Sequence, residues 1–160
     1  MRYAVNGFLL IVPLLLLDAL LGNRLPREYQ KQSWNAVPRW LSVAETALRI
    51  PVLLVPLLLP ISLSGPVQQA GAVLYLVGVL AYAAAWAAQI RHPHSAWSVS
   101  TAGFLAPAYT PALWLTGIAL VGAEPVLPHL GFLPAVFLGF VAAFLVTHNL
   151  HALYVHRHRI

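Results

Sequence analysis

The sequence predicts an all-α polytopic membrane protein with five transmembrane helices in a single domain over residues 1–160. Three observations predict this class: 60% of the side chains are hydrophobic, only 8% are charged, and the mean hydropathy is +0.78. Soluble domains carry roughly a quarter charged residues, so this composition indicates a chain surrounded by lipid. Cysteine is absent, which excludes disulfide bonds, thiolate nucleophiles and cysteine-ligated metals.

Each predicted helix is an apolar stretch close to the ~20 residues that a helical crossing requires. Turn-forming or polar residues separate the stretches, and these residues end helices and keep loop backbone in water. No stretch alternates apolar and polar residues as membrane strands do. The five predicted spans are residues 3–21, 45–63, 70–90, 101–122 and 130–150.

Proline and small residues distinguish three of the spans. The prolines are Pro51, Pro56 and Pro60 in the second span, and Pro107 and Pro111 in the fourth. Because proline removes a helical hydrogen bond, we expect both spans to bend or unwind and thereby open a hydrophobic cavity, although proline is also common in ordinary membrane helices. The third span holds Gly71, Gly78 and the alanine-rich residues 83–88, which permit close helix contact. We therefore expect residues 70–90 to form the central, most enclosed helix.

The positions of the basic residues predict the orientation. Of the nine lysines and arginines, all except Arg2 fall on the side of the membrane that holds the loop before residue 45, residues 91–100 and the C-terminal tail. Short basic loops stay in the cytoplasm, so we expect the N-terminus outside and the C-terminus inside a bacterial inner membrane. The net charge of +5 then favours contact with anionic membrane lipids. No basic and aromatic surface module predicts nucleic-acid binding.

Charged residues inside the spans are rare, and they mark candidate functional positions. Asp18 and Arg49 lie within predicted spans, and Glu45 precedes Arg49 by one helical turn. The order of Glu45 and Arg49 suits an ion pair on one helix face. We expect Asp18, Arg49 and Glu45 to form an intramembrane ion pair that clamps helices together, with a substrate or proton site as the alternative.

Six of the seven histidines fall on the predicted cytoplasmic side. If the last helix continues past the membrane, His148, His151 and His158 share one face. Such a stripe either meets lipid headgroups or offers imidazoles to a transition metal. Because no acidic residue follows Glu124 to complete a ligand set, we predict no metal site. Haem held by two histidines of different helices is also disfavoured, because only His148 lies within a span.

One loop motif resembles a family of membrane enzymes. Arg91-His92-Pro93 lies in a predicted cytoplasmic loop, and two last helices and a tail follow it. This arrangement resembles the isoprenylcysteine carboxyl methyltransferase and phospholipid methyltransferase group, whose signature is Arg-His-Pro-x-Tyr. Trp97-Ser98 and residues 103–122 look similar to the neighbouring stretch of that family. Ser95 stands at the position of the signature tyrosine.

The resemblance implies a helical enzyme that binds S-adenosylmethionine at the cytoplasmic face. Arg91, His92 and Trp97 would then bind this cofactor, and Tyr109 and Trp114 would line the substrate pocket. His148 or His151 would act as the catalytic base.

Three functional hypotheses follow. The first is a membrane-embedded enzyme that modifies a lipid or isoprenoid substrate at the cytoplasmic face, as a divergent methyltransferase would. The second is a non-catalytic subunit or assembly factor with a protein partner in a membrane complex. The third is a small carrier of a hydrophobic molecule, or a metal-handling protein.

Overall fold

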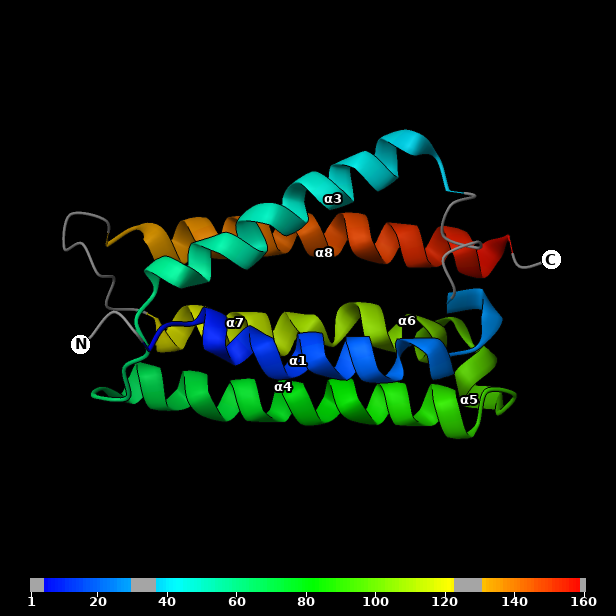
Figure 1. The fold of residues 1–160 in the computed structure, drawn as a ribbon, viewed down its shortest axis with the longest axis horizontal. Helices are drawn as coiled ribbons and strands as arrows, with labels where there is room; N and C mark the ends of the chain where they lie inside the picture. Colours follow the sequence, from blue (N-terminus) through cyan, green and yellow to red (C-terminus); the bar gives the residue numbers. More distant parts are fainter. Residues whose placement is uncertain (1–4, 30–36, 123–130, 159–160) are drawn as a thin grey trace.

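The computed structural model describes residues 5–29, 37–122 and 131–158, and in this part of the chain the regular elements are all helices, apart from one isolated β-bridge between Asn6 and Pro60 (Figure 1). The helices are α1 (Phe8–Leu21), η1 (Gly22–Arg24), η2 (Arg27–Tyr29), α3 (Arg39–Leu54), η3 (Val55–Leu58), α4 (Pro66–Arg91), α5 (Ala96–Val99), α6 (Thr101–Tyr109), α7 (Pro111–Val121) and α8 (Leu133–Arg157).

Within the described residues, four helical segments are long and apolar enough to cross a membrane: Arg39–Leu58, Pro66–Arg91, Thr101–Val121 and Leu133–Arg157. These segments indicate an integral membrane protein, in agreement with the predicted class. The remaining long helix, α1, has 14 residues. At 1.5 Å per residue it extends about 21 Å, which is less than the ~30 Å hydrocarbon core of a bilayer. The first four residues of the chain, where the predicted first span begins, lie outside the described residues.

Two helices are longer than the apolar stretches that predicted them. The helix α3 begins at Arg39 rather than residue 45, and α8 continues to Arg157 rather than ending at residue 150. Hydropathy predicts which residues contact lipid, whereas a helix continues as long as its backbone hydrogen bonds do. The polar extensions therefore belong to the same rigid elements as the apolar parts.

The predicted proline breaks are present in both proline-containing spans. The helix α3 changes to the tighter η3 at Val55, next to Pro56. The fourth span is divided at Thr110 into α6 and α7, because Pro111 cannot donate a hydrogen bond to the preceding turn. Thr110 Oγ1 donates instead to the Ala106 carbonyl at 2.7 Å.

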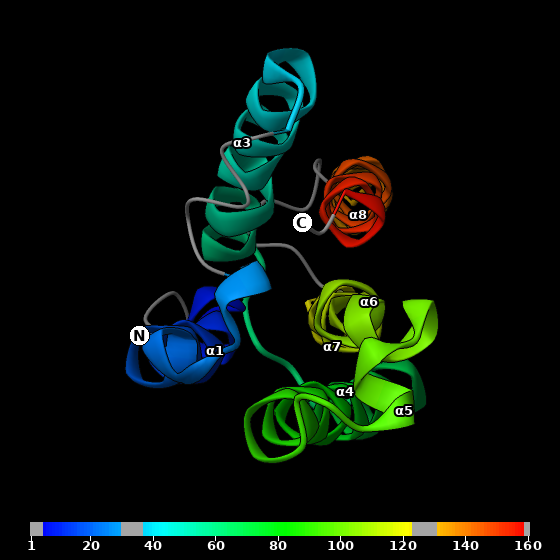
Figure 2. The same ribbon diagram turned by 90° about the vertical axis from the view of Figure 1, so that its right-hand side faces the viewer.

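The five long segments alternate in direction along one axis (Figure 1): α1, α4 and α8 run one way, and α3 and the α6–α7 pair run the other. Seen from one end, α6 and α7 lie between α4 and α8 (Figure 2). In the apolar window of Thr101–Val121, 67% of the residues are buried, against 28% in the window of Pro66–Arg91. The expectation that residues 70–90 form the central helix is therefore wrong.

The small residues of α4 mark close contact rather than a central position. A Cβ added at Gly71 would lie 2.6 Å from Leu120 Cβ, and one added at Gly117 of α7 would lie 2.6 Å from the Tyr75 nitrogen. The helices α4 and α7 thus pack almost backbone to backbone along one face. Large exposed side chains on α4, such as Leu76 and Leu80, leave the rest of its surface for lipid.

A buried glutamine fixes the turn that follows α4. Gln89 is 1% exposed, and its Nε2 donates to the carbonyls of Gly103, at 2.8 Å, and Ser98, at 3.4 Å. Ser95 and Ser100 cap α5 and α6 by accepting hydrogen bonds from backbone N–H groups. These bonds hold α5 and α6 against the end of α4.

Candidate functional site

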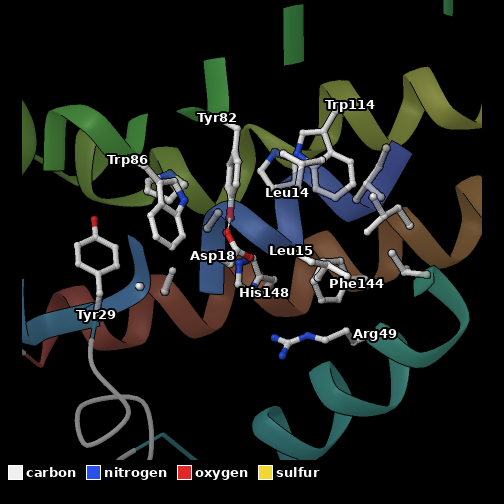
Figure 3. Close-up of a pocket in the computed structure, with 18 of the residues that line it drawn as sticks. Leu14, Leu15, Asp18, Tyr29, Arg49, Tyr82, Trp86, Trp114, Phe144 and His148 are labelled. Carbon is white, nitrogen blue, oxygen red and sulfur yellow. Dashed lines mark hydrogen bonds between the residues drawn. The ribbon is translucent and has the colours of Figure 1, made fainter. Parts of the chain in front are cut away.

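A cavity of about 370 Å³ lies between the helices (Figure 3). Every long helix contributes to its wall, and the break between α6 and α7 is part of it through Pro107, Ala108 and Pro111. The lining is largely aliphatic and aromatic. The aromatic lining residues are Tyr29, Tyr82, Trp86, Phe104, Trp114 and Phe144, and the charged or titratable ones besides the tyrosines are Asp18, Arg49 and His148.

Asp18 contributes a carboxylate to the cavity from the last turn of α1. Its Oδ1 accepts a hydrogen bond from the Tyr82 hydroxyl of α4 at 2.7 Å, and Figure 3 shows the two side chains pointing toward each other. Arg49 and His148 line the same cavity, but Asp18 forms no ion pair with any residue that the structure describes. Its one direct partner is therefore a neutral hydroxyl.

Glu45 is the centre of a second polar group, which joins α3 to α8. The residue is only 3% exposed. Its Oε1 accepts from His148 Nδ1 at 3.0 Å and pairs with Arg49, and its Oε2 accepts from His151 Nδ1. His148 and His151 are three residues apart and so lie on one face of α8, which lets one carboxylate bind both rings.

The contact with Glu45 fixes the chemistry of the His148 ring. A carboxylate only accepts hydrogen bonds, so Nδ1 must be the protonated nitrogen and Nε2 carries the lone pair when the ring is neutral. The ring also stacks on Phe144, with centroids 5.2 Å apart and planes inclined by 12°. Because His148 lines the cavity, an oriented imidazole forms part of the cavity wall.

Two lining residues are also exposed at the outer surface, which places the mouth of the cavity. Leu15 of α1 is 42% exposed, and the side chain of Arg49 of α3 is 50% exposed. The Arg49 guanidinium lies 5.8 Å from the centre of the Phe144 ring. The cavity therefore opens sideways between α1 and α3, with Arg49 at its edge.

Trp114 provides a hydrogen-bond donor inside the bundle. The indole Nε1 is buried and has no hydrogen-bond partner among the residues that the structure describes. Buried N–H groups are nearly always paired, and an exception calls for an explanation such as a bound ligand or water.

The structure brings together some of the predicted site residues and separates others. Asp18, Arg49, Trp114 and His148 line the same cavity. Glu45 and His151 lie behind His148, outside the lining. Of the expected intramembrane ion pair, Glu45 and Arg49 are in contact, whereas Asp18 binds Tyr82.

The residues predicted to bind a cofactor, Arg91, His92 and Trp97, lie outside the lining of the 370 Å³ cavity. Arg91 and His92 are exposed at the end of α4, and neither lines the 370 Å³ cavity. Trp97 and Tyr109 share a second hollow of about 310 Å³, between the alanines of α4 and Thr110. The helix α6 contacts both α4 and α8 and lies between them (Figure 2).

The remaining histidines of α8 do not extend the Glu45 group. His158 Nδ1 bonds to the Tyr154 carbonyl at 2.9 Å, and His156 Nε2 contacts Thr101 Oγ1 at 3.0 Å. Within the described ranges, no three histidine, aspartate or glutamate side chains are arranged to hold a metal ion.

Sequence reasoning missed Tyr82 and the role of Glu45 as a bridge between helices. A tyrosine in an apolar helix is unremarkable by itself. The spacing of His148 and His151 was a usable signal, because two imidazoles on one buried face need a polar partner.

Comparison with known proteins adds no relative: no family model, no curated protein and no solved structure matches this chain.

Proposed function

We propose that this protein is a membrane-embedded enzyme that modifies a lipid or isoprenoid substrate held in the cavity, with His148 as the general base. One observation carries the proposal: a largely apolar cavity between the helices has in its wall a histidine oriented by a buried carboxylate. Oriented imidazoles of this kind abstract or relay protons in many enzymes.

The shape of the cavity supports a lipid-like substrate. Its volume of about 370 Å³ is within the ~300–1,000 Å³ typical of small-molecule sites. The aliphatic walls suit an alkyl or isoprenoid chain, and the opening between α1 and α3 faces the side from which such a chain would come. The Trp114 N–H is a donor for a substrate oxygen.

The contacts favour His148 over His151 as the base. Both rings bind Glu45 through Nδ1, but only His148 lines the cavity. His151 holds the second carboxylate oxygen and thereby keeps Glu45 in place. In this proposal Glu45 and His151 are positioning residues, and Arg49 pairs with the same carboxylate oxygen of Glu45 as His148.

We further propose that α1 is a fifth crossing and that the protein has its N-terminus outside and its C-terminus in the cytoplasm. The alternation of helix direction and the distribution of basic residues support this topology. The cytoplasmic end then holds the end of α4 and the end of α8, where a polar donor would arrive. A bacterial inner membrane fits the same arrangement.

The resemblance to methyltransferases makes S-adenosylmethionine the donor to test first. If the protein binds this cofactor, increasing concentrations should raise its thermal stability by mass action. Arg91→Ala should abolish the shift. If millimolar S-adenosylmethionine does not stabilise the folded protein, this molecule is not the donor. The reaction in the cavity would then use a different donor.

The decisive experiment measures whether the protein changes the mass of a lipid. Purified protein is incubated with membrane lipid extract and small-molecule cytosol, and mass spectrometry compares the lipids with those from His148→Asn protein. We expect a new lipid mass with the wild-type protein alone, while native mass spectrometry shows bound lipid in both proteins. Lipid retained without conversion would favour a carrier, and a stoichiometric protein partner without conversion would favour an accessory subunit.

A further inference from the structure

We propose that the cavity recognises the positively charged head of an amphiphile, with Asp18 as the counter-ion and aromatic rings as the walls. The inference rests on the proposed function in one respect, because the same cavity would receive the substrate. It assigns a ligand class that the mechanism with His148 leaves open.

The balance of charge around the cavity favours a cation. Glu45 and Arg49 neutralise each other in direct contact. Among the described residues, no cation contacts the lining carboxylate of Asp18, whose partner there is the neutral Tyr82 hydroxyl. With Glu45 and Arg49 paired, the Asp18 carboxylate adds a negative charge to the cavity wall. A negative charge in an apolar site is costly, and one bound cation would balance it.

The aromatic rings beside Asp18 also favour a cation. The centroid of Tyr82 lies 5.8 Å from that of Trp86 and 6.4 Å from that of Trp114, with ring planes inclined by 59° and 63°. Figure 3 shows Trp86 and Trp114 on either side of Tyr82, whose hydroxyl end meets Asp18, so that the three rings form one aromatic wall beside this carboxylate. Aromatic faces attract ammonium groups, and tryptophan attracts them most.

The other charged groups that face the cavity disfavour an anionic head. An anion would meet the Asp18 carboxylate in the wall and Glu45 behind it. The Arg49 guanidinium in the same wall is already paired with Glu45, whose negative charge offsets its attraction for an anion. A cation next to Asp18 requires no existing ion pair to break.

The remaining walls suit the apolar part of such a ligand. Ile11, Leu14 and Leu115 are nearly fully buried and line the cavity. The opening at Leu15 and Arg49 lets a chain extend into the bilayer. The ligand class is therefore an alkyl or isoprenoid chain that carries one amine or quaternary ammonium group.

The test measures binding to intact protein in dodecyl maltoside, by quenching of tryptophan fluorescence and by calorimetry. The probes are dodecyltrimethylammonium, dodecanol and dodecyl phosphate, which share a chain and differ in head charge. We expect the cation to bind at least about tenfold more tightly than dodecanol, a difference of ~1.4 kcal/mol. Equal or weaker binding of the cation, or tighter binding of the phosphate, would overturn the proposal.

Matched variants assign the effect to Asp18. Asp18→Asn should remove the preference for the cation while leaving dodecanol affinity within about twofold. Glu28→Gln removes a carboxylate outside the cavity lining and should change neither affinity. Tyr82→Phe keeps the ring and should retain most of the cation preference, so that it checks the site even if Asp18→Asn fails to fold. An unchanged preference in folded Asp18→Asn, or its complete loss in folded Tyr82→Phe, would overturn the role of Asp18 with the aromatic walls.

The two proposals fail in different ways. Absence of a new lipid mass with the wild-type protein would refute the enzyme and leave cation binding intact. Absence of cation preference would refute the ligand class and leave lipid conversion by His148 intact.

Discussion

Glu45 joins two helices whose contacting residues lie far apart in the sequence. One carboxylate, almost fully buried, accepts from two rings of α8 and pairs with Arg49 on its own helix. The partners lie 103 and 106 residues away along the chain. The rarity of charge in the spans identified Asp18 and Arg49 as candidates, but no local pattern could reveal contacts over such separations.

Replacing Glu45 should destabilise the protein strongly. In Glu45→Gln the amide has one acceptor oxygen where two rings and a guanidinium need partners, so buried donors lose their bonds. A buried donor or acceptor that is left without a partner costs about 1–3 kcal/mol. Thermal or denaturant unfolding in detergent measures the change, and Glu28→Gln is the control, with an expected effect within about 0.5 kcal/mol. A Glu45→Gln protein as stable as this control would contradict the bridging role.

The Asp18–Tyr82 contact should appear as an energetic coupling between α1 and α4. A double-mutant cycle with Asp18→Asn and Tyr82→Phe measures how much more the charged carboxylate contributes to this hydrogen bond than a neutral amide would, which we expect to be about 1 kcal/mol. The matched cycle of Asp18→Asn with Arg49→Gln should give a smaller coupling, because those residues are not in direct contact. Additive effects of Asp18→Asn and Tyr82→Phe would show that the hydrogen bond does not join the helices.

At the scale of elements, the sequence predicted where helices are interrupted better than it predicted where each helix lies in the bundle. Pro56 and Pro111 disrupt helices through their own covalent structure, so the changes at Val55 and Thr110 followed from the sequence. The glycines of α4 do not mark the central helix. They permit close approach on one face, and which helix is enclosed depends on how many neighbours surround it. That number is a property of the whole bundle.

The close contact of α4 with α7 predicts a sharp difference between two glycines. In Gly117→Ala the new Cβ would lie 2.6 Å from the Tyr75 nitrogen, so α4 and α7 must separate, at a cost of about 1–3 kcal/mol. In Gly139→Ala the Cβ meets nothing within 4 Å, and alanine favours helix by up to ~1 kcal/mol. Unfolding in detergent should therefore show that Gly117→Ala is less stable than the wild type and that Gly139→Ala is at least as stable as the wild type. The reverse order would contradict the packing of α4 on α7.

At the scale of the molecule, the sequence predicted a helical membrane protein because composition reports the surrounding solvent directly. The cavity could be expected only in outline from the proline-containing spans. Its walls come from every long helix, and its polar residues meet only after the chain has folded back several times. The number of crossings depends on α1, whose 14 residues are short for a span.

The absence of cysteine from the sequence permits a direct test of the five-span topology. Single cysteines are introduced as Val5→Cys before α1, Arg24→Cys after it, Ser64→Cys before α4 and His94→Cys after α4, all at exposed positions. If α1 crosses the membrane, a membrane-impermeant maleimide added outside intact cells should label positions 5 and 64, whereas positions 24 and 94 should react only after the membrane is opened. This pattern is expected because α1 runs in the same direction as α4, and because Gly7 N donates to the Leu59 carbonyl at 2.7 Å, which ties the start of α1 to the end of η3. Labelling of positions 5 and 24 from the same side would show that α1 lies on one surface. Labelling of position 94 but not 64 from outside would reverse the assignment of faces, and the donor would then have to reach the cavity from the opposite side.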